Sequence, residues 1–210
     1  MSNIMQPPVE QAENKNTAAT MIELNNNIEE ITLTLTPDFD LTEIINGEEV
    51  MSPSPFRKHQ DIVFRMTLKL GNYITSKKLG KLLTSPLDVI LKEGSQRLQP
   101  DLLFIRRENL HIAQDWIRGV PDMVCEIVSE GSVVKDTVTK KDIYEYYKVP
   151  EYWIVIPQAQ SVEILTLEND KYRIYSSAAE GGGGGEEESI VRSKVIEGLE
   201  INIKELFEED

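Results

Sequence analysis

Two carboxylates lie in apolar surroundings in this 210-residue sequence and are the first candidates for chemistry. Asp101 follows Pro100 and opens the apolar run LLFI, and Glu126 lies inside the apolar run MVCEIV. A carboxylate inside an apolar strand is unfavourable unless an ion pair or a cation compensates its charge. Two such acids without a neighbouring histidine suit a hard, oxygen-preferring ion such as Mg²⁺ or Mn²⁺. The alternative is that Asp101 caps a turn and Glu126 pairs with a Lys or Arg, and the spacing alone leaves both open.

Other kinds of catalytic site find little support in the sequence. His59 and His111 are the only histidines, and neither belongs to a Ser or Cys nucleophile motif. The glycine run 181–185 lacks the Lys-Ser/Thr pair and the flanking strand and helix of a phosphate-binding loop. Cys125, the only cysteine, lies in an apolar strand pattern and is expected to be a buried packing residue.

Two helices are expected around the strands that carry the acids. The clearest covers residues 57–78, and the second runs from about 136 to 148, where Val149-Pro150 ends it. The first helix is predicted from apolar residues at helical spacing, namely Ile62, Met66, Leu70 and Tyr73.

The remaining elements are expected to be strands. Asn46-Gly47 is typical of a hairpin turn between LTEII and EEVMS. A strand-like end piece over 190–203 and a last helical turn over 203–207 close the chain. This order predicts an α/β (α+β) domain with a mixed central sheet. The other predicted strands cover residues 83–91 (broken by Pro86), 102–105, 123–128, 152–156, 161–167 and 172–175.

The net charge of −14 is concentrated at the two ends of the chain. Residues 1–40 contain seven acids and one base, and residues 180–210 contain ten acids and three bases. The stretch between them is nearly neutral, with 19 acids and 18 bases. The overall charge therefore argues only weakly against a nucleic-acid partner, although no basic stripe argues for one.

One domain with polar additions is the expected organisation. Residues 1–30 are predicted to be a disordered or loosely ordered acidic tail, and 31–210 a single domain with a flexible Gly/Glu-rich loop over 178–189. No run approaches the roughly 18 apolar residues of a membrane span, so no membrane partner is expected. With no secretory signal pattern and a single cysteine, a cytoplasmic protein is the natural expectation.

Three segments in order, PDLLFI, PDMVCEIVS and KDTVTKKDIYEYYKVPEYWIVIP, resemble the PD-(D/E)xK nuclease superfamily. More narrowly, the chain resembles the restriction-endonuclease-like family of prokaryotic endonucleases long known only as a domain of unknown function. The segments LTEIINGEEVMSPSPFRKHQDIV and IVRSKVIEGLEINIKELF also resemble that family's ends, so the resemblance covers about residues 35–207. It implies a restriction-endonuclease-like core, with a mixed central sheet flanked by helices and an additional N-terminal β-hairpin.

The resemblance also implies an acidic metal site with Asp101 and Glu126 as both catalytic residues and metal ligands. The motif usually has a Lys two residues after the second acid, but Val128 stands there. In this family the Lys is displaced onto the next helix, which favours Lys140 as the third catalytic residue, with Lys141 as a near competitor. The alternative for Lys140 is a solvated lysine that pairs with Asp136 at i, i+4.

Four further residues are weaker candidates for the same site. Glu43 precedes the Asn-Gly turn and could reach the metal from the hairpin, or it could be an ordinary acid beside a turn. His59 matches a recurrent family His at the start of the long helix and could orient a phosphate or a water, or it could cap the helix or lie at the edge of the core. Gln99 precedes the first motif and could hydrogen-bond the site, or it could be a surface residue. Asp136 completes the set as a possible partner of Lys140.

The implied function is a metal-dependent endonuclease that hydrolyses phosphodiester bonds in DNA, with Mg²⁺ or Mn²⁺ as its cofactor. A metal-activated water would attack phosphorus while Lys140 positions that water or stabilises the developing charge. Two alternatives stay open: an inactive nuclease fold that acts as a binding or assembly module, and a phosphodiesterase that acts on RNA or small nucleotides. DNA is the expected partner, and the family resemblance also implies a homodimer.

Overall fold

The computed structural model describes residues 42–51, 54–181 and 189–208. The predicted tail over 1–30 lies outside these residues, and so does most of the predicted loop over 178–189. The predicted single domain over 31–210 stays a prediction for the same reason. None of the described helices is long and apolar enough to cross a membrane.

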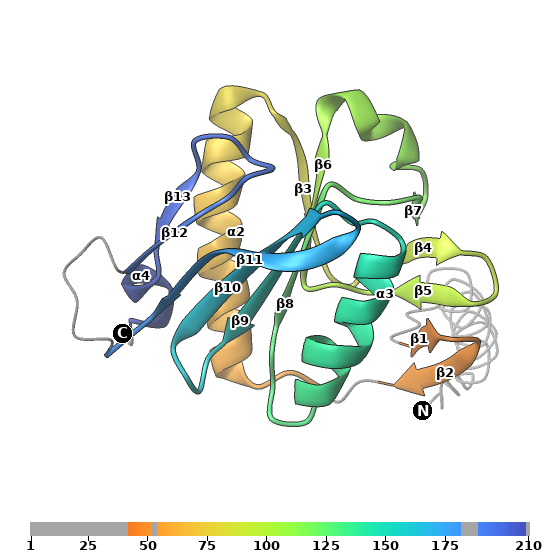
Figure 1. Ribbon diagram of the computed structural model, residues 1–210, viewed down its shortest axis with the longest axis horizontal. Helices are drawn as coiled ribbons and strands as arrows, with labels where there is room; N and C mark the ends of the chain where they lie inside the picture. The colour runs from red at the N-terminus through yellow and green to blue at the C-terminus, as the bar shows by residue number, and fades with distance from the viewer. Residues whose placement is uncertain (1–41, 52–53, 182–188, 209–210) are drawn as a thin grey trace, which may run out of the picture. The chain divides into compact units, whose positions relative to one another are not determined.

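A six-stranded sheet forms the centre of the described chain (Figure 1). Only β8 and β9 are parallel, and every other neighbouring pair is antiparallel, so the predicted mixed central sheet is confirmed. In spatial order the strands are β11 (Lys171–Ala179), β10 (Ser161–Glu168), β9 (Glu151–Ile156), β8 (Met123–Ile127), β6 (Leu102–Arg106) and β3 (Gly80–Thr84).

One face of this sheet is covered by α2 (Arg57–Lys77), close to the predicted helix (Figure 1). Its buried stripe contains Ile62, Met66 and Leu70 as predicted, but the fourth member is Ile74. Tyr73 is instead turned toward the C-terminal segment, where its hydroxyl donates to the Glu197 carbonyl at 2.9 Å.

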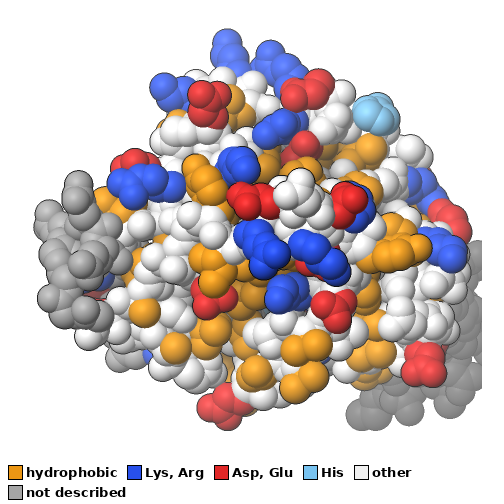
Figure 2. Space-filling view, viewed as in Figure 1, with side chains coloured by type: hydrophobic (Ala, Val, Ile, Leu, Met, Phe, Trp, Pro, Cys, Tyr) orange, Lys and Arg blue, Asp and Glu red, His pale blue; other side chains and the backbone are white. Residues whose placement is uncertain are grey.

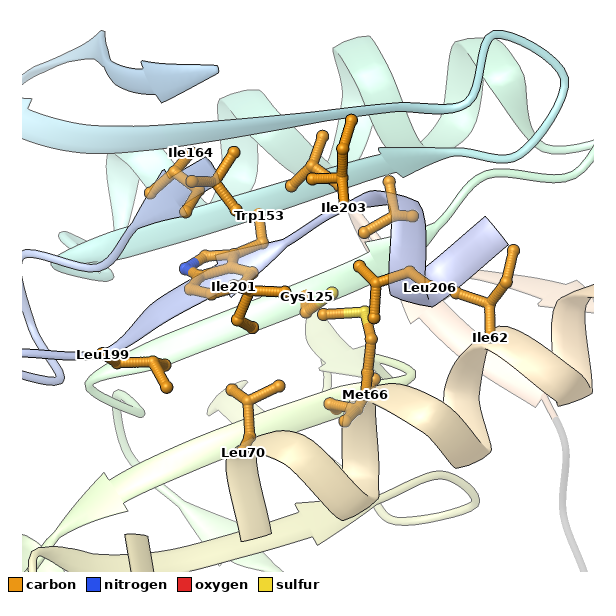
Figure 3. Close-up of a cluster of buried hydrophobic side chains, with 14 of the residues drawn as sticks. Ile62, Met66, Leu70, Cys125, Trp153, Ile164, Leu199, Ile201, Ile203 and Leu206 are labelled. Carbon is orange, nitrogen blue, oxygen red and sulfur yellow. The ribbon is translucent and has the colours of Figure 1, made fainter. Parts of the chain in front are cut away.

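The C-terminal segment completes this core beside α2. It contains β12 (Ile190–Arg192), β13 (Glu200–Asn202) and α4 (Lys204–Phe207). Figure 3 shows Leu199, Ile201 and Leu206 of this segment packed with Met66 of α2 and Trp153 of the sheet.

A buried carboxylate fastens the C-terminal segment to the sheet. The Glu151 side chain is 0% exposed and accepts hydrogen bonds from Trp153 Nε1 at 2.7 Å and Ser193 Oγ at 2.6 Å. The backbone N–H groups of Lys194 and Val195 donate to its other oxygen at 2.7 and 3.1 Å. Four donors therefore satisfy one charge in the core.

A second, five-stranded sheet contributes to the core on the opposite side of the central sheet. It includes the predicted hairpin, whose turn residues Asn46 and Gly47 both have positive φ, at 54° and 85°, as a type I′ turn requires. The hairpin is thus part of a larger sheet, which the sequence did not predict. In spatial order this sheet contains β2 (Glu48–Met51), β1 (Thr42–Ile45), β5 (Gln96–Leu98), β4 (Val89–Lys92) and β7 (Ile117–Arg118).

The connection from β8 to β9 forms the helical cover on this side of the central sheet. Parallel neighbours need a crossover connection, and here it contains η2 (Lys135–Lys140), a π-helix, followed directly by α3 (Lys141–Tyr146). The sequence predicted one helix over about 136–148, and the π-helical first part was not foreseen. Three successive β-branched residues, Thr137, Val138 and Thr139, weaken regular α-helix there. Single π-turns are frequent at functional sites.

Candidate active site

The two acids predicted from the sequence lie on the same face of the central sheet. Leu102 pairs with Cys125 in the β6–β8 ladder, and extending this register by one residue puts Asp101 opposite Glu126. Met123, Cys125 and Ile127 pack in the core with α2, so the alternating residue Glu126 points to the face that η2 and α3 cover.

Asp101 is held by two donors on one oxygen. Its Oδ2 accepts from the Ile127 N–H at 2.7 Å and lies 3.1 Å from His59 Nε2 in the first turn of α2. Since an ionised carboxylate only accepts, Nε2 carries the proton of this contact. The His59 Nδ1 is buried and makes no hydrogen bond within the described residues. The orientation of Asp101 thus depends on the β8 backbone and on α2.

Glu126 is a buried acid, 3% exposed, and its Oε1 contacts two side chains of the crossover. Lys140 Nζ, at the end of η2, donates to Oε1 at 2.9 Å, and the Tyr144 hydroxyl of α3 donates to the same oxygen at 2.9 Å. Lys140 is itself 2% exposed, so this is a buried ion pair rather than a solvated lysine. Val128 occupies the position of the usual motif lysine. It is buried in the hydrophobic cluster on the side of the central sheet that faces the five-stranded sheet.

Glu43 connects the hairpin to the same lysine. Its Oε1 lies 2.8 Å from Lys140 Nζ and accepts from the Gln99 N–H at 2.9 Å. Its Oε2 accepts from Lys135 Nζ at 3.0 Å. The side chain is 2% exposed, so Glu43 is a buried acid compensated by two lysines.

Asp136 and Gln99 also border this cluster. Asp136 Oδ1 lies 3.9 Å from Lys140 Nζ, the predicted i, i+4 contact, yet this buried oxygen has no hydrogen-bond partner among the described residues. The Gln99 side chain donates through Nε2 to Asp88 at 2.8 Å, while its backbone N–H serves Glu43.

The buried charges shift one another's protonation. Burial raises the pKa of Glu126 well above its ordinary value, although the Lys140 ammonium opposes this. Burial alone would lower the pKa of Lys140, but the carboxylates of Glu126, Glu43 and Asp136 reverse the effect and raise that pKa. The lysine is therefore a permanent cation in this pocket.

Two other groups respond to the same cluster. Burial favours a raised pKa at Glu43, but Lys140 and Lys135 outweigh it and lower that pKa below its ordinary value. Burial, together with the nearby Glu126 charge, raises the pKa of the Tyr144 hydroxyl well above its ordinary value. Tyr144 therefore keeps its proton and acts as a hydrogen-bond donor.

A pocket of about 330 Å³ opens onto these side chains. Its walls come from the hairpin, the first turn of α2, the β6 and β8 ends and η2. Lys141, the competing lysine, lines a different surface groove together with Arg173 and Ile174 of β11. Figure 2 shows the face formed by β11 and α3, with Lys and Arg side chains gathered near its middle. All seven residues predicted for the site line the first pocket, namely Glu43, His59, Gln99, Asp101, Glu126, Asp136 and Lys140.

The donor set of this pocket fits a hard divalent cation. No group of three or more His, Cys, Asp or Glu side chains within the described ranges is arranged to hold a metal ion by itself. Mg²⁺, however, is usually bound through one or two carboxylates, with water and substrate phosphate as its other ligands. Asp101 and Glu126 each have one oxygen engaged by the donors above, which leaves a second oxygen for such an ion.

Sequence reasoning missed two members of the cluster. Tyr144 was not among the predicted site residues, yet it is completely buried and its hydroxyl contacts Glu126. Its spacing of four residues from Lys140 and eight from Asp136 is the signal that could have revealed it. Lys135 offered no comparable signal, because its partner Glu43 lies 92 residues away.

Comparisons with known proteins agree with this architecture. The Uma2 family, described as "Putative restriction endonuclease", matches residues 29–204. The crystal structure of "a putative nuclease belonging to DUF820 from Anabaena variabilis ATCC 29413" superposes with a TM-score of 0.65 at 15% sequence identity. The match covers 84% of this chain and 94% of that one. At this identity the likeness shows a shared fold. A search of curated proteins found no match. The family match spans most of the sequence, and the chain therefore belongs to the Uma2 family of restriction-endonuclease-like proteins.

Proposed function

We propose that this protein is a divalent-cation-dependent endonuclease that hydrolyses phosphodiester bonds in DNA. The observation that carries the proposal is the buried contact between Glu126 and Lys140 at 2.9 Å, on the sheet face and in the pocket that Asp101 also lines. Family membership supports a nuclease-like function. Two acids and a lysine from three separate segments line this one pocket, which supports the proposal.

Each side chain has a defined role in this proposal. Asp101 and Glu126, with the Ile127 carbonyl, would hold Mg²⁺ or Mn²⁺. When bound, the cation makes a water more acidic and stabilises charge on a phosphate oxygen. His59 and the Ile127 N–H fix Asp101 through Oδ2. Glu43 is placed as a partner of Lys140 and Lys135, and it would balance their charge at the edge of the site.

Lys140 supplies the permanent positive charge that the reaction requires. Its ammonium donates hydrogen bonds and can hold the attacking water or the phosphate oxygen on which negative charge builds. The attacking water releases one proton to solvent as its oxygen bonds to phosphorus in line with the departing 3′ oxygen. The phosphorus–3′ oxygen bond breaks, and a proton from solvent neutralises the leaving 3′ oxygen. Because Lys140 is already anchored by Glu43, it needs little reorganisation for this task.

The direct test is cleavage of supercoiled plasmid DNA by the full chain in Mg²⁺, in Mn²⁺ and in EDTA. Asp101→Asn, Glu126→Gln and Lys140→Met should each reduce nicking at least about 100-fold, in line with the loss of a transition-state contact of a few kcal/mol. Normal cleavage by Asp101→Asn in Mg²⁺ would refute the assignment.

Matched controls separate chemistry from folding and charge. Lys141→Met removes the neighbouring lysine, which lines the other groove, and should leave cleavage unchanged. Glu130→Gln removes an exposed acid near the end of β8 and should also have no effect. RNA and cyclic or linear dinucleotides tested in parallel would reveal a phosphodiesterase with a different substrate.

A binding module without catalysis is the second candidate. It is favoured by the position of Lys140, whose ammonium lies between Glu43 and Glu126 where a cation would otherwise compensate the two acids. Calorimetry with Mn²⁺ distinguishes the two, since an inactive site should show the same heat for wild type and Glu126→Ala. The predicted homodimer and cytoplasmic location stay predictions.

A further inference from the structure

The Tyr144 hydroxyl lies in a position that a purely structural aromatic residue does not require. The residue is 0% exposed, and its hydroxyl donates to Glu126 Oε1 at 2.9 Å. Lys140 Nζ donates to this same oxygen, also at 2.9 Å. Both donors thus engage Oε1, and Oε2 is the oxygen of Glu126 that remains for another ligand.

Tyr144 is held more rigidly than Lys140. Its ring packs against the Tyr152 ring with a centroid distance of 5.1 Å and an interplanar angle of 55°. Only two side-chain torsions separate its hydroxyl from the α3 backbone, whereas Lys140 has four and divides its ammonium between Glu126 and Glu43. The tyrosine hydroxyl therefore defines the position of Oε1 even if the ammonium moves toward a phosphate.

We propose that Tyr144 is a positioning residue of the nuclease site, whose hydroxyl fixes the Glu126 carboxylate so that Oε2 is presented to a divalent cation. This inference rests on the proposed function. Hydrogen bonds to the far side of a ligating group typically change metal affinity or activity by about 10–100-fold when removed. The hydroxyl touches no substrate, so it acts only through Glu126.

Tyr152 provides a matched control within the same aromatic cluster. It is also 0% exposed, and its hydroxyl donates at 2.8 Å to the backbone carbonyl of Asp136 rather than to a site carboxylate. Tyr144→Phe and Tyr152→Phe each delete one buried hydroxyl with one hydrogen bond. They should lower the melting temperature comparably, and only the first should alter the cation site.

The experiment measures Mn²⁺ affinity by calorimetry for wild type, Tyr144→Phe and Tyr152→Phe. We expect the Mn²⁺ dissociation constant to be about 10-fold larger for Tyr144→Phe and to change by less than about 2-fold for Tyr152→Phe. The Mn²⁺ concentration for half-maximal plasmid cleavage should rise in parallel, and saturating Mn²⁺ should restore most of the rate. A variant that is partly unfolded still reports its affinity through the Mn²⁺-induced rise of its melting temperature.

The possible failures are distinguishable. Equal Mn²⁺ affinity in wild type and Tyr144→Phe, with weaker binding by Asp101→Asn, would overturn the role of Tyr144 and leave the proposed function intact. Equal losses in both tyrosine variants would overturn it too, because the effect would then be general loosening of the core. Absence of Mn²⁺ binding by the wild type would overturn the proposed metal-dependent function and this inference with it.

Discussion

Replacing Lys140 with methionine removes one charge from the buried cluster and leaves its partners behind. The ammonium lies 2.8 Å from Glu43 and 2.9 Å from Glu126, with Asp136 at 3.9 Å. Methionine fills a similar volume, so the perturbation is mainly electrostatic. The acids are not equally affected, because Glu43 keeps Lys135 at 3.0 Å whereas Glu126 keeps only neutral Tyr144.

The expected loss of stability follows from this inequality. Removing one partner of a buried ion pair typically destabilises a protein by about 3–5 kcal/mol. Lys135 still compensates Glu43, and Glu126 can take up a proton because burial already raises its pKa. Both effects favour the lower limit, about 3 kcal/mol. For a chain of this size that corresponds to a decrease in melting temperature of roughly 6–12 °C.

The loss should depend on pH in a defined direction. Burial raises the pKa values of Glu126 and Asp136, and their raised values make ionisation in the folded state unfavourable. A carboxyl with a raised folded-state pKa favours folding at low pH and loses that contribution as the pH rises. The difference between wild type and Lys140→Met should therefore shrink as the pH falls from 7.5 to 5.5.

Urea unfolding followed by circular dichroism in EDTA measures these differences, with Lys141→Met as the control. The double variant Lys140→Met/Glu126→Gln should recover most of the lost free energy, because it removes the uncompensated charge as well. Mn²⁺ should stabilise Lys140→Met more than wild type, since a cation can take the place of the ammonium. Identical urea midpoints for wild type and Lys140→Met would refute the reasoning.

Three further predictions concern the fold. Glu151→Ala removes the acceptor of two buried and two partly buried donors and should cost about 3 kcal/mol or more in urea unfolding while Mn²⁺ affinity stays unchanged; a loss below about 1 kcal/mol would contradict it. Hydrogen bonds from Lys171 and the Tyr172 N–H lower the pKa of Glu145 below its ordinary 4.5, so its contribution exists above that pH and is lost as the pH falls. Glu145→Gln should thus be less stable than wild type at pH 7, and this deficit should shrink as the pH falls below 4.5; a deficit that stays constant down to low pH would be inconsistent. Gly80→Ala would bring a Cβ within 2.0 Å of the β6 backbone and should lower the melting temperature. Gly71→Ala lies inside α2, where the added Cβ would be 3.8 Å from its nearest neighbour, and should raise the free energy of unfolding by about 0.5–1 kcal/mol. A change of stability in the same direction for both glycine variants would contradict this prediction.

Periodicity was sufficient to predict α2 and the strands of the central sheet other than β3. The predicted strand over 83–91 instead joins the end of β3 to most of β4, which lies in the five-stranded sheet. Apolar runs and alternating apolar residues produce a strong local signal in the other strands, and the α2 stripe needed only the exchange of Tyr73 for Ile74. The five-stranded sheet was beyond this reasoning. β5 and β7 contain three and two residues, too few for a recognisable alternation. β5 pairs with its sequence neighbour β4 but also with β1, and β7 pairs with β4, so the sheet depends on contacts between segments that are distant in sequence.

The site was predictable to different degrees for different residues. Asp101 and Glu126 stand out locally, because Asp101 directly precedes an apolar strand and Glu126 lies inside one. Lys140 could be selected only through the family resemblance, since nothing local distinguishes it from Lys141. The structure places Lys140 and Lys141 in two different pockets, because adjacent residues of a helix point in different directions. The helical spacing of Tyr144 from Lys140 indicates a shared helix face, but the bond from its hydroxyl to Glu126 depends on the packing of α3 against β8.

The charge balance of the pocket explains why a site of this kind can be both buried and stable before any cation binds. Four carboxylates face only two ammonium groups, so the cluster has an excess of negative charge that a single divalent cation could neutralise. Burial raises the pKa of Glu126, so a proton can offset part of this excess in the absence of a cation. A cation that replaces this proton would bind a Glu126 carboxylate that is already oriented. Lys140 would still be held by Glu43 and available to a phosphate. The charged groups concerned are Glu43, Asp101, Glu126, Asp136, Lys135 and Lys140.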